Sequence, residues 1–100
     1  QALNNMGNIY FRTGHLEQAA AVYEQYLRYN VDNPPALTAL GQVYLSLQRA
    51  DDAIGVLEKA VALDPQWAPA HQGLAEVYKR SGDIARSEEH RAVARQLKEE

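Results

Sequence analysis

Apolar residues recur three and four positions apart through most of the chain, and short segments containing glycine, proline or asparagine separate the apolar runs. This spacing is typical of amphipathic helices. Gly14 is expected to end the first helix in a left-handed conformation, and Asn33 is expected to cap the third. Because the loops are short, sequential helices should be antiparallel neighbours, and the predicted fold class is all-α. The pattern predicts helices at about residues 2–12, 16–29, 34–47, 50–63, 69–79 and 84–98.

The same arrangement of residues returns every 34 positions. The repeated positions are Leu3, Met6, Gly7 and Tyr10, then Leu37, Leu40, Gly41 and Tyr44, then His71, Leu74, Ala75 and Tyr78. Small residues recur at the same interval in the second helix of each pair, at Ala19, Ala53 and Ser87. A period of 34 with this pattern resembles the tetratricopeptide repeat, a helix–turn–helix unit that stacks into a solenoid.

The resemblance covers nearly the whole chain and implies a right-handed superhelical solenoid of three such repeats. It divides the chain into residues 1–33, 34–67 and 68–100, with the first repeat truncated at its N-terminus and the third ending in a capping helix. It also implies a protein-binding scaffold rather than an enzyme. The different chemistry of the two ends, described below, further predicts that the chain is the C-terminal part of a longer array.

Two glycines lie in the middle of predicted helices, where glycine costs about 1 kcal/mol relative to alanine. These are Gly7 and Gly41, at equivalent places in the first two repeats. The expected compensation is a close approach of the partner helix, which a side chain at these positions would prevent. Ala19 and Ala53 are expected to serve the same close contact from the second helix of each pair.

The two ends of the predicted solenoid differ in their chemistry. The second repeat has an apolar stripe at Ile54, Leu57 and Val61, and the positions 34 residues further on are Glu88, Arg91 and Arg95. A charged outer face is typical of a terminal repeat, so the solenoid is expected to end there. At the other end, Ala2, Met6 and Ile9 form an apolar stripe with no predicted cover, which favours self-association through the first helix.

Composition excludes several classes of protein. The formal net charge is −3, with no excess of basic residues that would favour nucleic acid as a partner. The sequence has no cysteine, so it has neither disulfides nor thiolate zinc sites. No apolar run is long enough for a membrane-spanning helix, and no signal peptide is recognisable. The compartment remains open between cytoplasm and periplasm.

The sequence contains no arrangement of residues that predicts catalysis or a cofactor. The three histidines, His15, His71 and His90, have neither the spacing nor the carboxylate partners of a metal site, and each is interpreted as structural. Nucleophile motifs, phosphate-binding loops and paired carboxylates are also missing. The chain is therefore predicted to have no enzymatic activity of its own.

The predicted functional surface is the uncovered face of the first helix in each repeat. Stacked repeats should place these faces side by side on a concave wall. Phe11 and Leu45 are expected to be its apolar anchors, because the core is not expected to need them, and Thr38 and Ser46 should lie beside them. The residues predicted to bind a partner are Asn4, Asn8, Phe11, Arg12, Gln42, Leu45, Gln72, Glu76 and Lys79.

The most plausible ligand of this wall is an extended peptide or a partner protein. Two alternatives remain: a substrate-selecting helper domain of a larger enzyme, such as a glycosyltransferase, and an oligomeric assembly module. A known mode of the family resembles a clamp of basic and amide side chains around a chaperone's terminal carboxylates. Only Asn8 matches that clamp here, and its other places hold Asn4, Ala39, Pro69 and Gly73.

Three aromatic residues have two interpretations each. Trp67 lies between Pro65 and Pro69 and is expected either to pack against these prolines and cap the fifth helix, or to contact a ligand. Tyr26 and Tyr29 stand where the family usually has smaller residues. They are expected either to fill a wider gap between repeats or to form an exposed aromatic patch.

Overall fold

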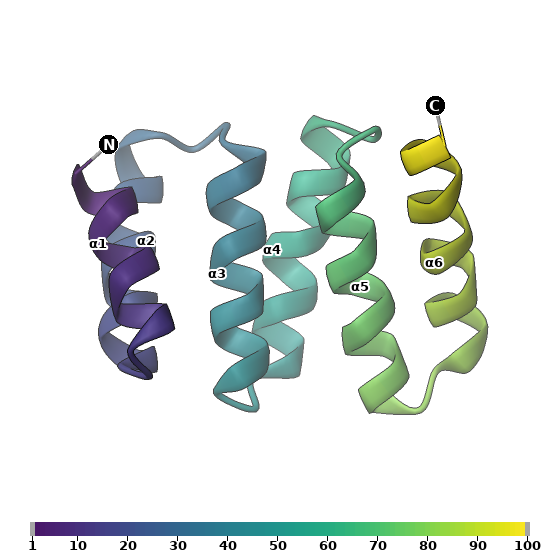
Figure 1. Ribbon diagram of the computed structural model, residues 1–100, viewed down its shortest axis with the longest axis horizontal. Helices are drawn as coiled ribbons and strands as arrows, with labels where there is room; N and C mark the ends of the chain where they lie inside the picture. Colours follow the sequence, from purple (N-terminus) through teal and green to yellow (C-terminus); the bar gives the residue numbers. More distant parts are fainter. Residues whose placement is uncertain (1, 100) are drawn as a thin grey trace.

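The computed structural model describes residues 2–99, and the side chains of residues 5–98. The described chain is helical throughout, with no strand, which confirms the all-α prediction (Figure 1). The helices confirm the predicted order, and only α3 and the ends of α5 and α6 differ from the predicted ranges by one or two residues. The helices are α1 (Ala2–Arg12), α2 (Leu16–Tyr29), α3 (Pro34–Ser46), α4 (Ala50–Leu63), α5 (Ala68–Ser81) and α6 (Ile84–Glu99).

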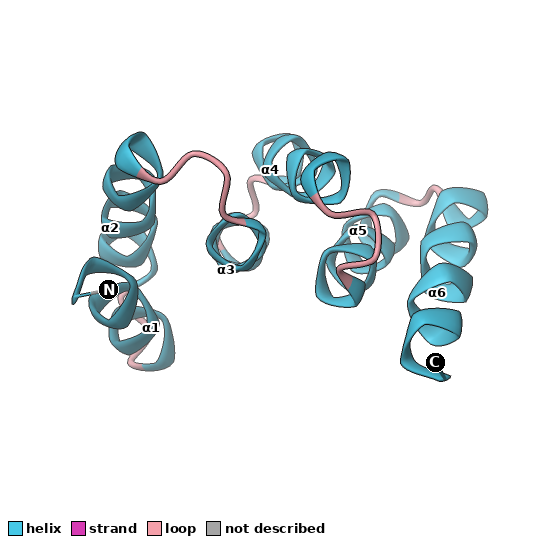
Figure 2. Ribbon diagram, turned by 90° about the horizontal axis from the view of Figure 1, so that it is seen from above, coloured by secondary structure: helices cyan, strands magenta, loops and turns pink. Residues whose placement is uncertain are grey.

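The helices stack as antiparallel pairs in chain order. Helix α1 packs on α2, α3 on α4, and α5 on α6. The first helix of each later pair also packs on both helices of the pair before it, so that α3 contacts α1 and α2, and α5 contacts α3 and α4. Figure 1 shows α1, α3 and α5 in front, with α2 and α4 behind them. Seen from above, α3 is set back between α1 and α5, so the front face is concave (Figure 2).

Local capping signals explain where the helices end. Gly14 and Gly82 have φ values of 83° and 88°, the left-handed conformation that glycine adopts without strain. The Asn33 side chain accepts a hydrogen bond from the Ala36 amide at 3.0 Å, which confirms the predicted cap of α3. Gln48 occupies the equivalent place after α3 and also has a positive φ, of 64°. A glutamine there is strained by about 1–2 kcal/mol, and the sequence pattern did not predict it.

The central glycines confirm the predicted close approach of paired helices. A Cβ atom added to Gly7 would lie 2.7 Å from the Tyr23 ring, and one added to Gly41 would lie 2.6 Å from Leu57 Cγ. The Leu57 side chain also reaches Gly73, where an added Cβ would meet Leu57 Cδ2 at 2.9 Å. Leu57 is 1% exposed and therefore fills the space between α3 and α5 from its place on α4.

A repeated hydrogen bond connects each pair of helices to the next. The Tyr44 hydroxyl donates to Glu24 on α2, and 34 residues on the Tyr78 hydroxyl donates to Glu58 on α4 at 3.1 Å. Burial, followed by the hydrogen bond to Glu24, raises the pKa of Tyr44 above its usual value. The phenol therefore stays protonated and donates at physiological pH. These bonds hold α3 and α5 in register on the preceding pair.

Tyr26 and Tyr29 each follow one of the two interpretations. Tyr26 is buried between repeats, where its hydroxyl accepts a hydrogen bond from Asn33 Nδ2 at 3.0 Å. Tyr29 is 80% exposed at the end of α2. Tyr26 thus fills the gap between the first two repeats, whereas Tyr29 adds an aromatic group to the outer surface.

Candidate functional site

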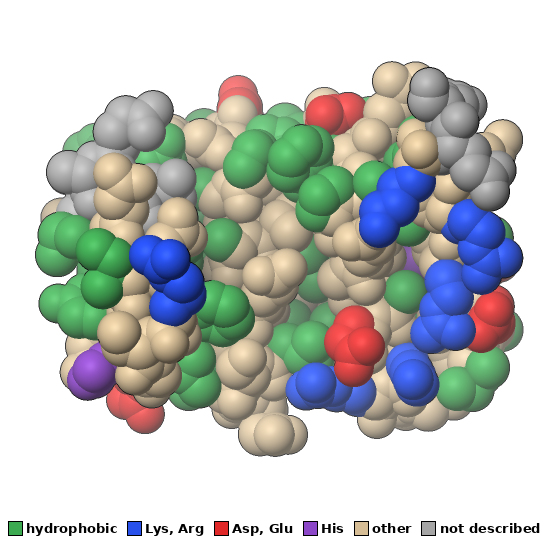
Figure 3. All heavy atoms as spheres, in the orientation of Figure 1, with side chains coloured by type: hydrophobic (Ala, Val, Ile, Leu, Met, Phe, Trp, Pro, Cys, Tyr) green, Lys and Arg blue, Asp and Glu red, His purple; other side chains and the backbone are tan. Residues whose placement is uncertain are grey.

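The concave face is built from α1, α3 and α5, which the packing places side by side (Figure 3). Of the residues predicted to bind a partner there, Asn4 lies outside the described side chains. Phe11, Leu45 and Glu76 are half-buried. The exposed members are Asn8, Arg12, Gln42, Gln72 and Lys79.

The two predicted anchors are also part of the folded core. Phe11 and Leu45 both pack against the main cluster of buried residues, which includes Tyr23, Leu40 and Tyr44. The expectation that the core does not need them is therefore wrong. Both are only half-buried, so each combines contact with the core and surface that solvent can reach.

Thr38 does not lie on the open wall as predicted. It is 4% exposed, and its hydroxyl donates to the Pro34 carbonyl at 2.8 Å and accepts from Trp67 Nε1 at 3.0 Å. Its neighbour in the predicted stripe, Ser46, is exposed. The sequence pattern missed the burial of Thr38 because the tryptophan that covers it comes 29 residues later.

Trp67 packs against a second small cluster formed by Leu37, Ala60 and Ala70. It immediately precedes α5, but its side chain makes no capping hydrogen bond to that helix. Trp67 is nevertheless the N-cap residue of α5, as predicted, and its carbonyl accepts a hydrogen bond from the Ala70 amide at 3.1 Å. The indole also connects the start of α5 to α3 through Thr38. Trp67 as a whole is half-buried.

Charge is unevenly distributed along the front face. At the α1 end, the Asn8 side-chain oxygen accepts a hydrogen bond from the Tyr23 hydroxyl, so this acceptor is already engaged. On α5, Glu76 forms an ion pair with Arg80 at 2.9 Å. Figure 3 shows most of the basic side chains of this face gathered over α5 and α6, whereas the surface over α3 is largely uncharged.

A pair of histidines connects α5 to α6. His71 is 6% exposed, its Nε2 donates to the Pro65 carbonyl at 2.9 Å, and its Nδ1 lies 3.0 Å from Nδ1 of His90. With Nε2 protonated, neutral His71 accepts at Nδ1, so His90 donates there. Burial, and then the nearby His71, lower the pKa of His90 below its usual value. The lowered pKa favours the neutral form of His90 at this interface.

The histidines were predicted to be structural, and the observed contacts assign them to packing between helices. Neither histidine has a carboxylate within ion-pairing distance among the described residues. In the part of the chain that the structure describes, no group of three or more potential ligands could hold a metal ion. None of the described helices combines the length and apolar character needed to cross a membrane.

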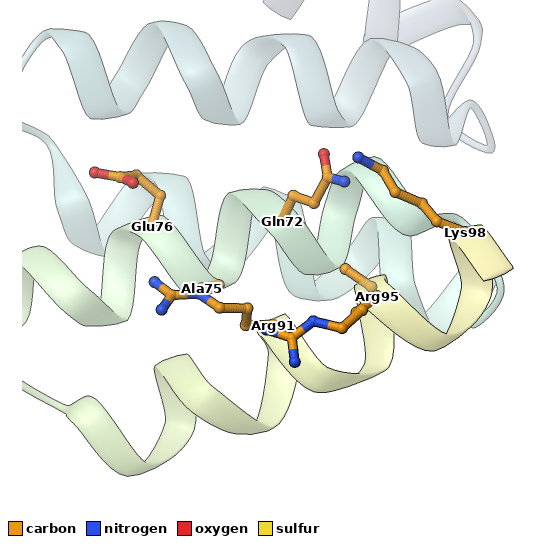
Figure 4. A pocket seen from close by; sticks show the side chains of 7 residues that line it. Gln72, Ala75, Glu76, Arg91, Arg95 and Lys98 are labelled. Carbon is orange, nitrogen blue, oxygen red and sulfur yellow. The ribbon is translucent and has the colours of Figure 1, made fainter.

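A hollow of about 320 Å³ lies between α5 and α6, near the C-terminal end of the stack (Figure 4). It contains Gln72 and Glu76 from the predicted wall, together with side chains of α6 that were predicted to face only solvent. No pattern in the sequence predicts a cavity at this place. Its lining residues are Gln72, Ala75, Glu76, Arg91, Ala94, Arg95 and Lys98.

The stacked pairs, the concave face of first helices and the mixed amide, apolar and charged surface define a helical-repeat interaction module. The tetratricopeptide repeat model matches residues 4–67, and a second model with the same description matches residues 44–92. The chain belongs to the tetratricopeptide repeat family.

Two relatives from Arabidopsis thaliana are much longer than this chain. The TPR repeat-containing thioredoxin TTL4 is 28% identical over 96% of this chain, which corresponds to 14% of that protein. The Protein CTR9 homolog is 33% identical over 72% of this chain and 7% of its own length. The chain therefore spans only a small part of the curated relatives that it matches.

Solved structures share the fold. A crystal structure of MamA superposes with a TM-score of 0.90 at 23% identity, covering 98% of this chain and 57% of that one. The first TPR of Spaghetti (RPAP3), bound to the HSP90 peptide SRMEEVD, has a TM-score of 0.93 at 21% identity, covering 96% of this chain and 76% of that one. At these identities the similarity establishes the solenoid architecture.

Proposed function

We propose that this domain is a protein-interaction scaffold that binds an extended partner segment along its concave face. The observation that carries the proposal is that two half-buried apolar residues, Phe11 and Leu45, lie on helices whose adjoining wall positions are polar and exposed. The proposed site comprises Asn4, Asn8, Phe11, Arg12, Gln42, Leu45, Gln72, Glu76 and Lys79. The proposed repeats are residues 1–33, 34–67 and 68–100, and the chain itself is proposed to be non-catalytic.

The chemistry of the wall fits a peptide main chain with one or two apolar side chains. Amide groups such as those of Gln42 and Gln72 donate and accept hydrogen bonds at once, as an extended backbone requires. Phe11 and Leu45 offer apolar surface that is already positioned by the core, so little side-chain entropy is lost on binding. Lys79 adds a positive charge at the α5 end, which favours an acidic residue in that part of the partner.

Truncation of the anchors is expected to weaken binding of peptides selected from a random linear library displayed on phage. Leu45→Ala and Phe11→Ala should each reduce affinity by about 1–2 kcal/mol or more, since a few apolar anchors dominate interface energy. The matched control is Leu63→Ala, because Leu63 is 41% exposed on α4. Affinities are measured by calorimetry, and thermal melts verify that each variant is folded.

An NMR titration with the same peptide locates the site independently. Shifts should cluster on α1, α3 and α5. Shifts restricted to outer positions such as Glu58, Lys59 and Glu89, together with unchanged affinity of Leu45→Ala, would refute the concave site and assign binding to the convex surface.

A chaperone-type C-terminal peptide is not expected to be the ligand. The two RPAP3 structures with which this chain shares its fold are described as bound to the HSP90 peptide SRMEEVD. Here the places of the basic donors for terminal carboxylates hold Asn4, Pro69 and Gly73, none of which carries a charge. Titration with SRMEEVD should therefore give a dissociation constant no tighter than about 1 mM, near −4 kcal/mol. A micromolar constant that is lost in Asn8→Ala would contradict this prediction.

Two observations support further proposals about the context of the domain. The relative TTL4 is named as a thioredoxin that contains TPR repeats, and this chain matches 14% of it, which supports a helper domain within a larger protein as the alternative function.

Met6 and Ile9 are 43% and 52% exposed, three residues apart on α1. We propose that Ala2, Met6 and Ile9 form a contact with a second copy, although Ala2 lies outside the described side chains.

A further inference from the structure

The hollow between α5 and α6 occupies the place where the stack would receive another helix. Within the solenoid, α5 lies against the pair α3 and α4, and α3 lies against the pair α1 and α2. The last pair, α5 and α6, presents the same kind of seat. The α6 residues that line the hollow include Arg91, Ala94 and Arg95, which follow by 34 residues the α4 positions Leu57, Ala60 and Val61.

The interior seat shows what kind of element fits. Leu57 of α4 closely approaches Gly73 of α5, and Ala60 belongs to one buried cluster with Ala70 of α5. At the C-terminal seat, Ala94 keeps the small residue, 3% exposed, and Ala75 lies at the place of Gly41. The hollow therefore retains small residues, Ala75 and Ala94, against which a helix can pack closely. It has Arg91 and Arg95 where α4 has the apolar Leu57 and Val61.

Basic side chains define the chemistry of this hollow. Arg91, Arg95 and Lys98 are four and three residues apart, so they share one face of α6 and border the hollow together (Figure 4). Glu76, the acidic residue of the lining, is already paired with Arg80. Arg91 forms an ion pair with Glu88 at 3.2 Å. The Arg91 side chain stays 42% exposed in that pair. A chain of net charge −3 thus carries a localised basic seat.

We propose that this seat binds an amphipathic helix of a partner that presents carboxylates along one face. Such a helix gains charge-assisted hydrogen bonds from the arginines and buries its small residues over Ala75 and Ala94. A second copy of this chain fits poorly, because the described apolar face of α1, with Met6 and Ile9, would bury the arginines without partners. This site shares Gln72 and Glu76 with the proposed peptide wall, but it lies at the end of the stack and accepts a helix rather than an extended segment.

The test uses the 100-residue chain and two synthetic helical peptides, each stabilised by a side-chain staple. One carries glutamates one turn apart on a single face with alanines beside them, and the other replaces each glutamate with lysine. The glutamate helix should bind and the lysine helix should not. Arg91→Glu with Arg95→Glu should weaken the glutamate helix at least about tenfold and create binding of the lysine helix. Binding should also weaken with added salt.

A matched control separates this site from general electrostatics and from the peptide wall. Arg28→Glu with Lys59→Glu makes the same change in net charge at exposed positions outside the hollow, and it should leave binding unchanged. Leu45→Ala should also have no effect, so failure of the wall proposal and failure of this one give different results. Circular dichroism confirms that the charge-reversed variants remain helical. Equal binding of an unstapled, proline-containing acidic peptide, or insensitivity to the arginine reversal, would overturn the proposal.

Discussion

Gly41→Leu is expected to lower the free energy of unfolding by roughly 1–3 kcal/mol or more. A Cβ atom at this position would already lie 2.6 Å from Leu57 Cγ, closer than real contacts permit. Leu57 cannot move away easily, because on its other side it lies against Gly73 of α5. The gain in helix propensity, at most about 1 kcal/mol, is too small to compensate. Thermal and denaturant unfolding measure the effect, at about 4–8 °C for each kcal/mol.

Gly55 provides the matched control within the same helix pair. A Cβ added at Gly55 would meet no atom within 4 Å, although this glycine is also inside a helix. Gly55→Leu should therefore leave stability unchanged or raise it. Adding Leu57→Ala to Gly41→Leu should recover part of the loss, because the smaller side chain makes room. An unchanged or higher melting temperature of Gly41→Leu alone would show that the pairing of α3 with α4 is wrong.

Met6→Glu combined with Ile9→Lys is expected to convert a self-associated form of this chain into a monomer. Both side chains are about half exposed on one face of α1, and contiguous exposed apolar residues favour association. The two new charges are three residues apart, so they form a helical pair and leave α1 itself stable. Sedimentation velocity over a range of concentrations should show a larger apparent mass for the parent chain than for the variant.

Exposed apolar residues near the opposite end of the chain provide the control for this assembly. Ile84 and Val93 on α6 are 55% and 37% exposed, so Ile84→Lys with Val93→Glu introduces the same pair of charges elsewhere. This variant should associate as the parent does. If the parent is already strictly monomeric at high concentration, the proposed contact through α1 does not exist.

Much of the proposed partner surface followed from the helical period, and part of it did not. Asn8, Arg12 and Gln42 were predicted to lie on the uncovered faces of their helices, and all three are exposed. Periodicity gives the direction of a side chain around its own helix, but not what a later segment places over it. Thr38 was assigned to the open wall for this reason, and Trp67 buries it. Whether the exposed residues bind a partner stays a prediction.

The sequence by itself determined the helices, their order and the family. These depend on local signals, namely apolar spacing, Gly14 and Asn33 at helix ends, and a pattern that recurs with a fixed period. The close helix approach at Gly41 was also predictable from sequence, because a glycine inside a helix costs stability unless a close neighbour requires it.

Only the tertiary structure decided how residues distant in the sequence meet. His71 and His90 come from different helices, and neither has a local pattern that predicts its partner. The basic surface of the hollow arises in the same way. Arg91 and Arg95 were predicted to face solvent, and the packing of α6 on α5 places them at the edge of the hollow. Contacts of this kind depend on the crossing of two helices, and small changes in that crossing alter which side chains touch. The spacing of residues along one helix does not determine this crossing, whereas the packing of the whole solenoid does.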